Sequence, residues 1–329
     1  MKRRQLLRAG VAGVVSGGFT VQGGPAYGLA EDSRYPERPI RILLGFPPGG
    51  STDGPMRVLA ANASKTLGQP IVIENKPGAA GVLPAQLLQS SRPDGYTLAV
   101  IPQSVFRLPY TTDINWNPAD LAYILGLTGY VFGIVVPSSS PIKTMADYIA
   151  YAKAHPGELT YSTPGSLTTN HLTMEQISQT AGIRLTHVPY KGTSESLQAL
   201  LGGHVLSAAE TGGWQTYVES GKLRLLAVWG EKRMPRFPNV PTLKECGIDI
   251  VQSSPWGLAA PKGTPAPIIA RLHATFKQAM AQDNFRDALK PYDMEPTYMS
   301  PDQYRRFAIS AMEREKAVLE SIRYRKNSG

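Results

Sequence analysis

The chain has 329 residues, 42% of them hydrophobic, and a formal net charge of +9. This length exceeds what one hydrophobic core usually serves, so two domains are expected. A single cysteine, Cys246, excludes an intramolecular disulfide and a cysteine-based metal cluster, and the five histidines match no metal-binding spacing. The basic residues form no dense patch of the kind that binds nucleic acid. We therefore expect no metal, no cofactor and no nucleic-acid partner.

The first 30 residues have the pattern of a secretory signal peptide. All four charged residues of this stretch are basic, the first acidic residue is Glu31, and a short apolar run rich in glycine and valine lies between them. Small residues at 28–30 predict cleavage near Ala30, which leaves a net charge of 9 − 4 = +5. The arginine pair at 3–4 resembles a twin-arginine export signal, although a Sec signal can also carry one. Because no later run is long enough to cross a bilayer, we expect a soluble periplasmic protein.

From residue 40 onward, short apolar runs bounded by glycine and proline alternate with stretches of helical periodicity. The runs predicted as strands are 40–46, 71–73, 97–101, 131–136, 159–162, 185–188, 205–209, 223–228 and 256–260. The stretches predicted as helices are 53–66, 82–89, 145–154, 171–180 and 194–201. Two more helices are expected after Thr264-Pro265 and Ser300-Pro301, where the hydroxyl is typical of an N-cap. The alternation predicts parallel sheets with helices on both faces.

Two glycine-rich loops connect the first two predicted strands to the helices that follow. In the first, FPPGGSTD at 46–53, the glycines allow close approach of a ligand to the backbone, and Ser51, Thr52 and Asp53 are helix-capping types. The helix N-terminus after it favours an anion. In the second, ENKPGAAG at 74–81, a nest of backbone donors is possible. Each loop alone is equally compatible with an ordinary capped turn.

Two later loops have the same position between a strand and a helix. The loop at 162–171 has six neutral hydrogen-bonding side chains, and the loop at 189–194 adds the phenol of Tyr190 and the cation of Lys191. Ligands bind beyond the carboxyl ends of the strands in open α/β sheets. Four such loops, rich in donors and poor in acids, therefore predict one shared polar cleft.

Nine short motifs occur in a fixed order along the chain after the signal peptide. They are RPIR at 38–41, FPPGGSTD at 46–53, LGQP at 67–70, ENKPGA at 74–79, DGYT at 94–97, PG at 156–157, HVPYKG at 187–192, PNVPT at 238–242 and PKGTP at 261–265. In identity and order they resemble the tripartite tricarboxylate transporter receptors, also called Bug-type extracytoplasmic solute receptors. The most specific of them are the VPYKG and NKPGA segments.

This resemblance implies an α/β, type II-like periplasmic binding protein fold with two lobes, each a mostly parallel sheet flanked by helices, and a ligand cleft between them. The chain would cross the hinge twice, so that lobe 1 comprises 31–133 with 258–329 and lobe 2 comprises 134–257. It further implies a monomer without catalytic activity that captures a small organic acid in the periplasm. The partners would be membrane subunits of a transporter.

The four loops and the resemblance together give a set of candidate ligand-binding residues. They are Phe46, Pro48, Gly49, Gly50, Ser51, Thr52, Asp53, Gly78, Ala79, Ala80, Gly81, Ser104, Thr163, Ser166, Thr168, Thr169, Asn170, Tyr190 and Glu210. The family often has an acid before its LLGG motif and another after the next valine, where this chain has Ala199 and Leu206. Glu210 stands near the end of that strand instead, either as an acceptor for a ligand amine or hydroxyl or as a helix cap. Lys191 is either a ligand contact or a surface charge.

Two other function classes remain open at this stage. The segment at 49–53 nearly matches the nucleophile elbow of hydrolases, but Asp53 replaces its last glycine. A hydrolase built on Ser51 and His171 would also need a third carboxylate and an oxyanion hole. A receptor that passes its signal to a sensor protein would use the same residues as a transport receptor. No phosphate-binding or dinucleotide motif is present.

Overall fold

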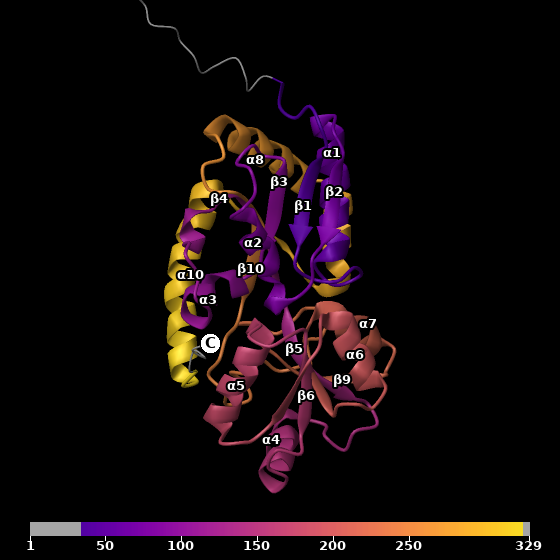
Figure 1. Cartoon of the computed structure of the whole chain (residues 1–329). Coiled ribbons are helices and arrows are strands. Elements are labelled where there is room, and N and C mark those ends of the chain that lie inside the picture. The colour runs from indigo at the N-terminus through magenta and orange to yellow at the C-terminus, as the bar shows by residue number, and fades with distance from the viewer. Residues whose placement is uncertain (1–33, 325–329) are drawn as a thin grey trace, which may run out of the picture. The chain divides into compact units, whose positions relative to one another are not determined.

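The computed structural model describes residues 34–324, and the residues from Pro36 onward form one unit by their contacts. The signal peptide expected over 1–30 lies outside the described residues. Two separate sheets, each flanked by helices, make up this unit (Figure 1). We call the six-stranded sheet with its helices lobe 1, and the five-stranded sheet with its helices lobe 2. The expected α/β class with two sheets is confirmed.

Lobe 1 is built on a mixed sheet in the order β11-β4-β10-β3-β1-β2. Its strands are β1 (Ile40–Leu44), β2 (Ile71–Asn75), β3 (Thr97–Ile101), β4 (Ala122–Tyr130), β10 (Ser254–Ala260) and β11 (Pro296–Met299). Its helices are α1 (Asp53–Leu67), α2 (Leu83–Leu88), α3 (Ser104–Thr111), α8 (Ala266–Met280), α9 (Asp283–Leu289) and α10 (Pro301–Ser321). Short 3-10 turns lie at η2 (Ala79–Gly81), η3 (Pro118–Asp120) and η5 (Lys290–Tyr292). β10 and β11 run against the other four strands.

Lobe 2 has the strand order β7-β6-β8-β5-β9, in which β5 alone among the described strands runs against its neighbours. Its strands are β5 (Phe132–Pro137), β6 (Thr160–Thr163), β7 (Thr186–Pro189), β8 (Ser207–Thr211) and β9 (Leu223–Val228). Its helices are α4 (Met145–Ala154), α5 (Thr169–Ala181), α6 (Thr193–Leu201) and α7 (Gln215–Glu219), with a 3-10 turn at η4 (Gly212–Trp214).

The apolar run of β5 shows why lobe 2 buries both faces of its sheet. Side chains alternate across a strand. Ile134 and Val136 therefore join a core with residues of α4 and α5, whereas Val135 joins a second core with Leu197 and Leu200 of α6. An uninterrupted apolar strand is typical of a sheet covered on both sides.

The chain crosses between the sheets where β4 ends and β5 begins, and it returns to the first sheet at β10. β5 starts at Phe132 and β10 starts at Ser254, a few residues before the expected boundaries. The division into 31–133 with 258–329 and 134–257 stays a prediction of where the lobes separate.

The two C-terminal helix starts differ from each other. Ser300 caps α10 in a capping box, because its hydroxyl accepts from Gln303 N and the Gln303 side chain accepts from Ser300 N. The predicted Thr264 cap is wrong. The N-cap of α8 is Pro265, and the Thr264 hydroxyl donates instead to the Pro261 carbonyl at 2.8 Å.

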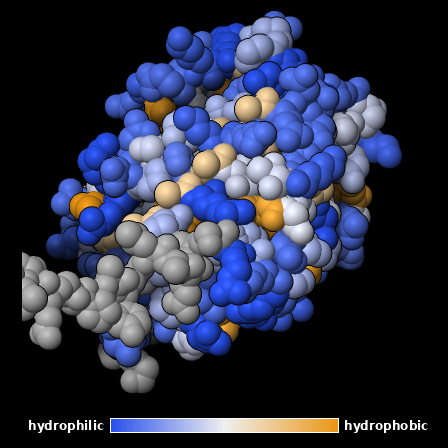
Figure 2. Space-filling model, turned by 90° about the horizontal axis from the view of Figure 1, so that it is seen from above, coloured by the Kyte–Doolittle hydropathy of each residue, from blue (hydrophilic) through white to orange (hydrophobic). Residues whose placement is uncertain are grey.

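Among residues 34–324, none of the helices combines the length and apolar character needed to cross a bilayer. The face seen from above Figure 1 is mainly hydrophilic, and its hydrophobic atoms form small separate spots (Figure 2).

Candidate functional site

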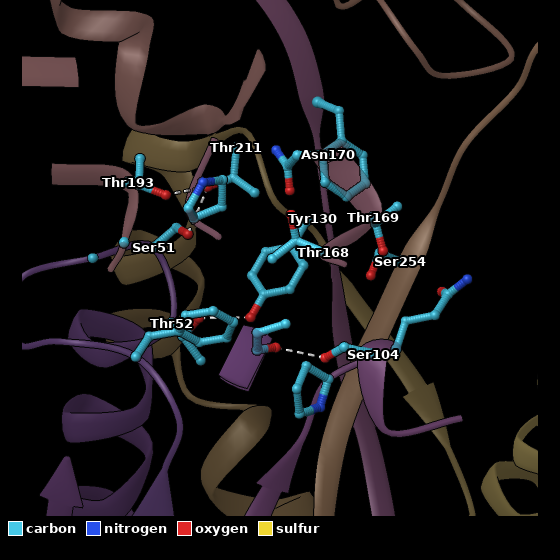
Figure 3. Close-up of a pocket in the computed structure, with 18 of the residues that line it drawn as sticks. Ser51, Thr52, Ser104, Tyr130, Thr168, Thr169, Asn170, Thr193, Thr211 and Ser254 are labelled. Carbon is cyan, nitrogen blue, oxygen red and sulfur yellow. Dashed lines mark hydrogen bonds between the residues drawn. The ribbon is translucent and has the colours of Figure 1, made fainter. Parts of the chain in front are cut away.

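The four loops predicted to form a cleft follow β1, β2, β6 and β7. β1 is parallel to β2, and β6 is parallel to β7, so each pair of loops leaves its sheet at the same edge. A cavity lies between these edges, with walls from both lobes (Figure 3). Lobe 1 contributes residues of the loops after β1, β2 and β3. Lobe 2 contributes the starts of α5 and α6 and the end of β8.

Four helices begin at the cavity wall. Thr52 is the N-cap of α1, Gln103 that of α3, Thr168 that of α5 and Gly192 that of α6, and all four residues line the cavity. The first turn of a helix has backbone N–H groups without intrahelical partners, and the helix dipole adds positive potential there. The arrangement therefore suits an anionic group.

Hydroxyl groups connect the two lobes across the cavity. The Ser51 hydroxyl lies 3.0 Å from that of Thr211, which lies 3.1 Å from that of Thr193 (Figure 3). On the lobe 1 side, Thr52 Oγ1 lies 2.6 Å from the phenol oxygen of Tyr130. Ser51 belongs to lobe 1 and Thr211 to lobe 2, and we call this arrangement, with the hydroxyls of the two lobes in contact across the cavity, closed.

Aromatic rings surround the place where the chain crosses between the lobes. Tyr130 and Phe132 line the cavity. Tyr130 stacks on Trp256 with ring centroids 5.8 Å apart, and Phe132 stacks on Trp229 at 5.1 Å. Burial raises the pKa of Tyr130, so its phenol stays protonated and serves as a neutral hydrogen-bonding group. The cavity thus combines hydroxyls and helix starts with an apolar, aromatic side.

Of the described residues that line the cavity, Glu195 alone is charged. Asp53 lies outside the wall and is used within lobe 1. Its carboxylate accepts hydrogen bonds from Arg57 Nε at 2.8 Å, Asn75 Nδ2 at 2.9 Å and Gly49 N at 3.0 Å. Burial alone would raise the pKa of Asp53, but these three bonds outweigh it and the pKa is lowered. Asp53 therefore stays ionised and fixes the first loop.

The structure brings nine of the predicted site residues to the cavity wall. They are Phe46, Gly50, Ser51, Thr52, Ala80, Ser104, Thr168, Thr169 and Asn170. Outside the wall lie Pro48, Gly49, Asp53, Gly78, Ala79, Gly81, Thr163, Ser166, Tyr190 and Glu210. The role of both groups of residues in ligand binding stays a prediction.

Several of the outlying residues shape the loops behind the wall. A Cβ on Gly81, whose φ is +81°, would lie 2.6 Å from the ring of Phe46, so only glycine allows this packing. Ala79 and Ala80 both adopt positive φ, and the Ala80 carbonyl accepts from the Ser104 hydroxyl at 2.7 Å. Two successive left-handed alanines are strained, and strain of this kind is concentrated at functional sites.

A pair of stacked histidines fixes the third loop. The rings of His171 and His187 lie 4.1 Å apart, His171 Nδ1 accepts from Leu167 N, and His187 Nε2 lies 2.7 Å from Thr163 Oγ1. Burial lowers the pKa of both histidines, that of His187 to about 3, so the pair is neutral at physiological pH. Thr163 and His171 therefore support the third loop. The hydrogen-bond partner of Ser51 is Thr211 and not His171.

A family of known proteins matches most of the chain. The profile of the family described as "Tripartite tricarboxylate transporter family receptor" matches residues 56–324. The chain belongs to this family.

A relative from Cupriavidus necator, the "UPF0065 protein in gbd 5'region", is 58% identical over 98% of both chains. Among solved structures, the periplasmic binding protein BugD has a TM-score of 0.83 at 26% identity, covering 89% of this chain and 100% of its own. MatC of Rhodopseudomonas palustris, solved with malate, has a TM-score of 0.80 at 27% identity, with coverage of 87% and 100%. A second R. palustris protein, solved with adipate, has a TM-score of 0.82 at 29% identity, with coverage of 88% and 98%. The two-lobed fold expected from the sequence motifs is therefore confirmed.

In this receptor, Glu210 is fully buried one residue before the wall residue Thr211. Its Oε2 accepts from Thr211 N at 3.3 Å, while its Oε1 has no hydrogen-bond partner. Burial raises the pKa of Glu210 to about 8, and the hydroxyls of Ser196 and Thr193 offset part of this rise. Glu210 is therefore a neutral carboxylic acid behind the wall, beside the N–H of Thr211 and the hydroxyls of Thr193 and Ser196 in the first turn of α6.

The receptor's cavity is also lined by residues that the set of candidate ligand-binding residues did not include. They are Pro47, Pro102, Gln103, Tyr130, Phe132, Pro164, Gly192, Thr193, Ser194, Glu195, Thr211 and Ser254. Gly192, Thr193 and Ser194 belong to the fourth predicted loop, so their position at a helix start was a usable signal. Tyr130, Phe132 and Ser254 lie where the chain crosses between the lobes, and no local pattern indicates such a position.

Proposed function

We propose that this protein is a periplasmic solute receptor that captures a small carboxylate between its lobes and delivers it to the membrane subunits of a tripartite tricarboxylate-type transporter. It acts as a monomer and returns its ligand chemically unchanged. One observation carries the proposal: four helices begin at the wall of a single cavity that both lobes enclose.

The chemistry of the wall supports a carboxylate over other anions. Helix N-termini and hydroxyls supply neutral donors, which suit a single delocalised charge, whereas the described wall has no Lys, Arg or His to balance a multiply charged phosphate. The aromatic side formed by Tyr130 and Phe132 suits the carbon skeleton of the ligand. The similar receptors solved with malate and adipate also hold small carboxylates.

A signalling receptor would use the same cavity, and the genes beside this one would distinguish the two roles. Genes for one large and one small membrane subunit would support uptake. A gene for a sensor in their place would support signalling. The geometry does not favour a hydrolase, because the described hydrogen bonds pair Ser51 with Thr211 and His171 with Leu167 N.

The first prediction concerns the charge of the ligand. In a thermal-shift screen of carboxylates, amino acids and aromatic acids, a true ligand at a hundredfold excess over its Kd should stabilise the fold by about 2.7 kcal/mol. Conversion of its carboxylate to the amide should remove most of the affinity, because the helix starts then face a neutral group. Calorimetric titration of the acid and the amide measures this, and equal affinities would contradict the proposal.

The same preparation tests turnover. Mass spectrometry of the recovered ligand should show the starting compound alone. A product that disappears in the Ser51→Ala variant would instead establish a hydrolase. Weak dependence of Kd on salt concentration should accompany binding, because the donors are neutral.

A further inference from the structure

Arg107, in the middle of α3, is a buried arginine beside the cavity. Its side chain is 2% exposed, and its partner Glu315 on α10 is also 2% exposed. Arg107 Nε and Nη2 both lie 2.7 Å from Glu315 Oε2. Removing two charges from water costs several kcal/mol per ion, so such a pair persists only where further hydrogen bonds satisfy it. Both residues belong to lobe 1.

The remaining donors of the guanidinium reach lobe 2. Nη1 donates to the carbonyl of Leu167, and Nη2 donates to Thr169 Oγ1 at 3.2 Å. Both acceptors lie at the start of α5, and α10 packs against α3 and α5 on the same side of the molecule (Figure 1). Arg107 therefore joins the lobes through charged hydrogen bonds, which are about twice as strong as neutral ones.

The accepting loop is held in an unfavourable backbone conformation. Leu167 has a φ of +59°, which is uncommon for a bulky residue and requires support from its surroundings. Its N–H donates to His171 Nδ1 at 3.2 Å, and its carbonyl accepts from Arg107. Arg107, in lobe 1, thus helps to hold the backbone of Leu167, in lobe 2, in this conformation.

The same cluster is connected to the cavity wall on both sides of the cleft. Gln103 lines the cavity and donates from Nε2 to Glu315 Oε1, and Thr169 lines it from lobe 2. We infer that Arg107 is a positioning residue that clasps the closed lobes: held by Glu315, it fixes Leu167 and Thr169 where lobe 2 meets the ligand. These bonds form only when the two lobes are close together. The importance of the clasp for uptake rests on the proposed function.

The guanidinium is suited to this role by its planar fork of donors. A lysine would preserve the charge beside Glu315 but would lack the rigid fork that reaches two acceptors in lobe 2 at once.

Other variants test the same contacts from the second lobe. Thr169→Val removes one acceptor without exposing a buried charge, and Thr169→Ser restores the acceptor. Because Arg107→Met alone would leave Glu315 unpaired and could unfold the chain, the double variant Arg107→Met/Glu315→Met replaces the whole pair by apolar residues, which is often neutral for stability.

The experiment measures hydrogen exchange of the amides at 167–172 and small-angle X-ray scattering, both without added solute. We expect exchange at least tenfold faster, and a larger radius of gyration, in Arg107→Lys and in the double variant. Thr169→Val should show a smaller change in the same direction, and Thr169→Ser should match the parent. Arg233→Gln, which breaks an exposed pair with Glu245 inside lobe 2, is the control and should change neither measurement.

Unchanged exchange and scattering in folded Arg107→Lys and in the folded double variant would overturn the clasp. Titration with adipate and malate as probes separates this outcome from failure of the proposed function. If the parent binds neither probe but the exchange results are as expected, the clasp stands and these carboxylates are not ligands. If the parent and the double variant bind a probe equally, the receptor function stands and the clasp is refuted.

Discussion

At the scale of single residues, Glu210 and Asp53 show how the environment decides the role of a carboxyl group. Both were expected in the ligand site from the sequence, and both lie outside the cavity wall. Asp53 receives three hydrogen bonds and stays ionised. Glu210 has one unpartnered oxygen and keeps its proton. Residue type alone indicates an acid at each position, whereas burial and partners, which depend on the tertiary fold, determine its charge.

The raised pKa of Glu210 makes stability depend on pH. Its ordinary value is 4.5 and its folded value about 8, so between these pH values the folded state keeps a proton that the unfolded state has lost. Raising the pH through this window therefore costs the folded state about 1.4 kcal/mol per unit. Glu210→Gln removes the titration, so the variant should gain stability relative to the parent from pH 5 to pH 8.

Urea unfolding at several pH values measures this difference. Glu195→Gln makes the same chemical change at an exposed side chain of α6 that lines the cavity, and it serves as the control for stability. A constant difference between Glu210→Gln and the parent across the window would show that the buried carboxyl ionises freely. Below about pH 4.5 the two proteins should differ by a constant amount.

At the scale of elements, the sequence pattern predicted nine of the eleven described strands and missed β4 and β11. β4 contains Gly126 and Gly129, and β11 is four residues long with largely exposed side chains. The glycine at 126 has a tertiary cause, because a Cβ there would lie 2.9 Å from Cβ of Met299 on β11. The sequence of β4 alone does not show that a side chain of the neighbouring strand β11 leaves room only for glycine at position 126.

Helix α3 was missed for a related reason. It contains Pro109 and the charged Arg107, a combination that in the sequence is typical of a surface segment with low helix propensity. Only the approach of Glu315, 208 residues later in the chain, explains why this arginine is buried. The loops of the site were easier to predict, because glycines and capping residues directly after a strand have a local cause.

The first loop offers a test at this scale. Gly50 lines the cavity, and a Cβ on it would meet only the Pro47 carbonyl, at 3.8 Å. Gly50→Ala should therefore fold and retain most of the affinity for the best carboxylate of the screen. Gly50→Leu should fold with a modest loss of stability and lose binding, because its side chain occupies the ligand's space beside the helix start. Thermal unfolding and calorimetry measure the two effects.

A folded Gly50→Leu variant that binds normally would mean that the first loop is only a capped turn. Thr169→Val offers a comparison from lobe 2. It should weaken binding less than Gly50→Leu does, because it removes the hydrogen bonds of one hydroxyl and leaves the space of the cavity open.

At the scale of the whole molecule, the proposed function depends on contacts that join the two lobes. The Ser51–Thr211 hydroxyl pair and the bonds from Arg107 to Leu167 and Thr169 all join the two lobes. The family resemblance implied two lobes with two crossings between them, and the four loops predicted a cleft. The sequence did not predict these contacts, because each one joins two residues that are far apart in the chain and that only the tertiary fold brings together.

Gly192 provides a direct test of closure. It is the N-cap of α6 in lobe 2 with a φ of 178°, an extended conformation that any residue adopts. A Cβ on it would lie 2.9 Å from Cδ of Pro47 in lobe 1, closer than packed carbons tolerate. Gly192→Ala should therefore disfavour the closed state without straining its own backbone. Because overpacking of this kind costs about 1–3 kcal/mol, affinity for the selected carboxylate should fall about fivefold or more.

Scattering without solute distinguishes lobe opening from simple filling of the cavity. Gly192→Ala should have a larger radius of gyration than the parent and an unchanged unfolding midpoint, since the clash disappears when the lobes separate. Gly129→Ala is the matched control, because its Cβ would make an ordinary 3.6 Å contact with Pro255 inside lobe 1. If Gly192→Ala scatters like the parent and binds with the same affinity, the lobes close with more room than the structure allows, and the closed-state mechanism fails.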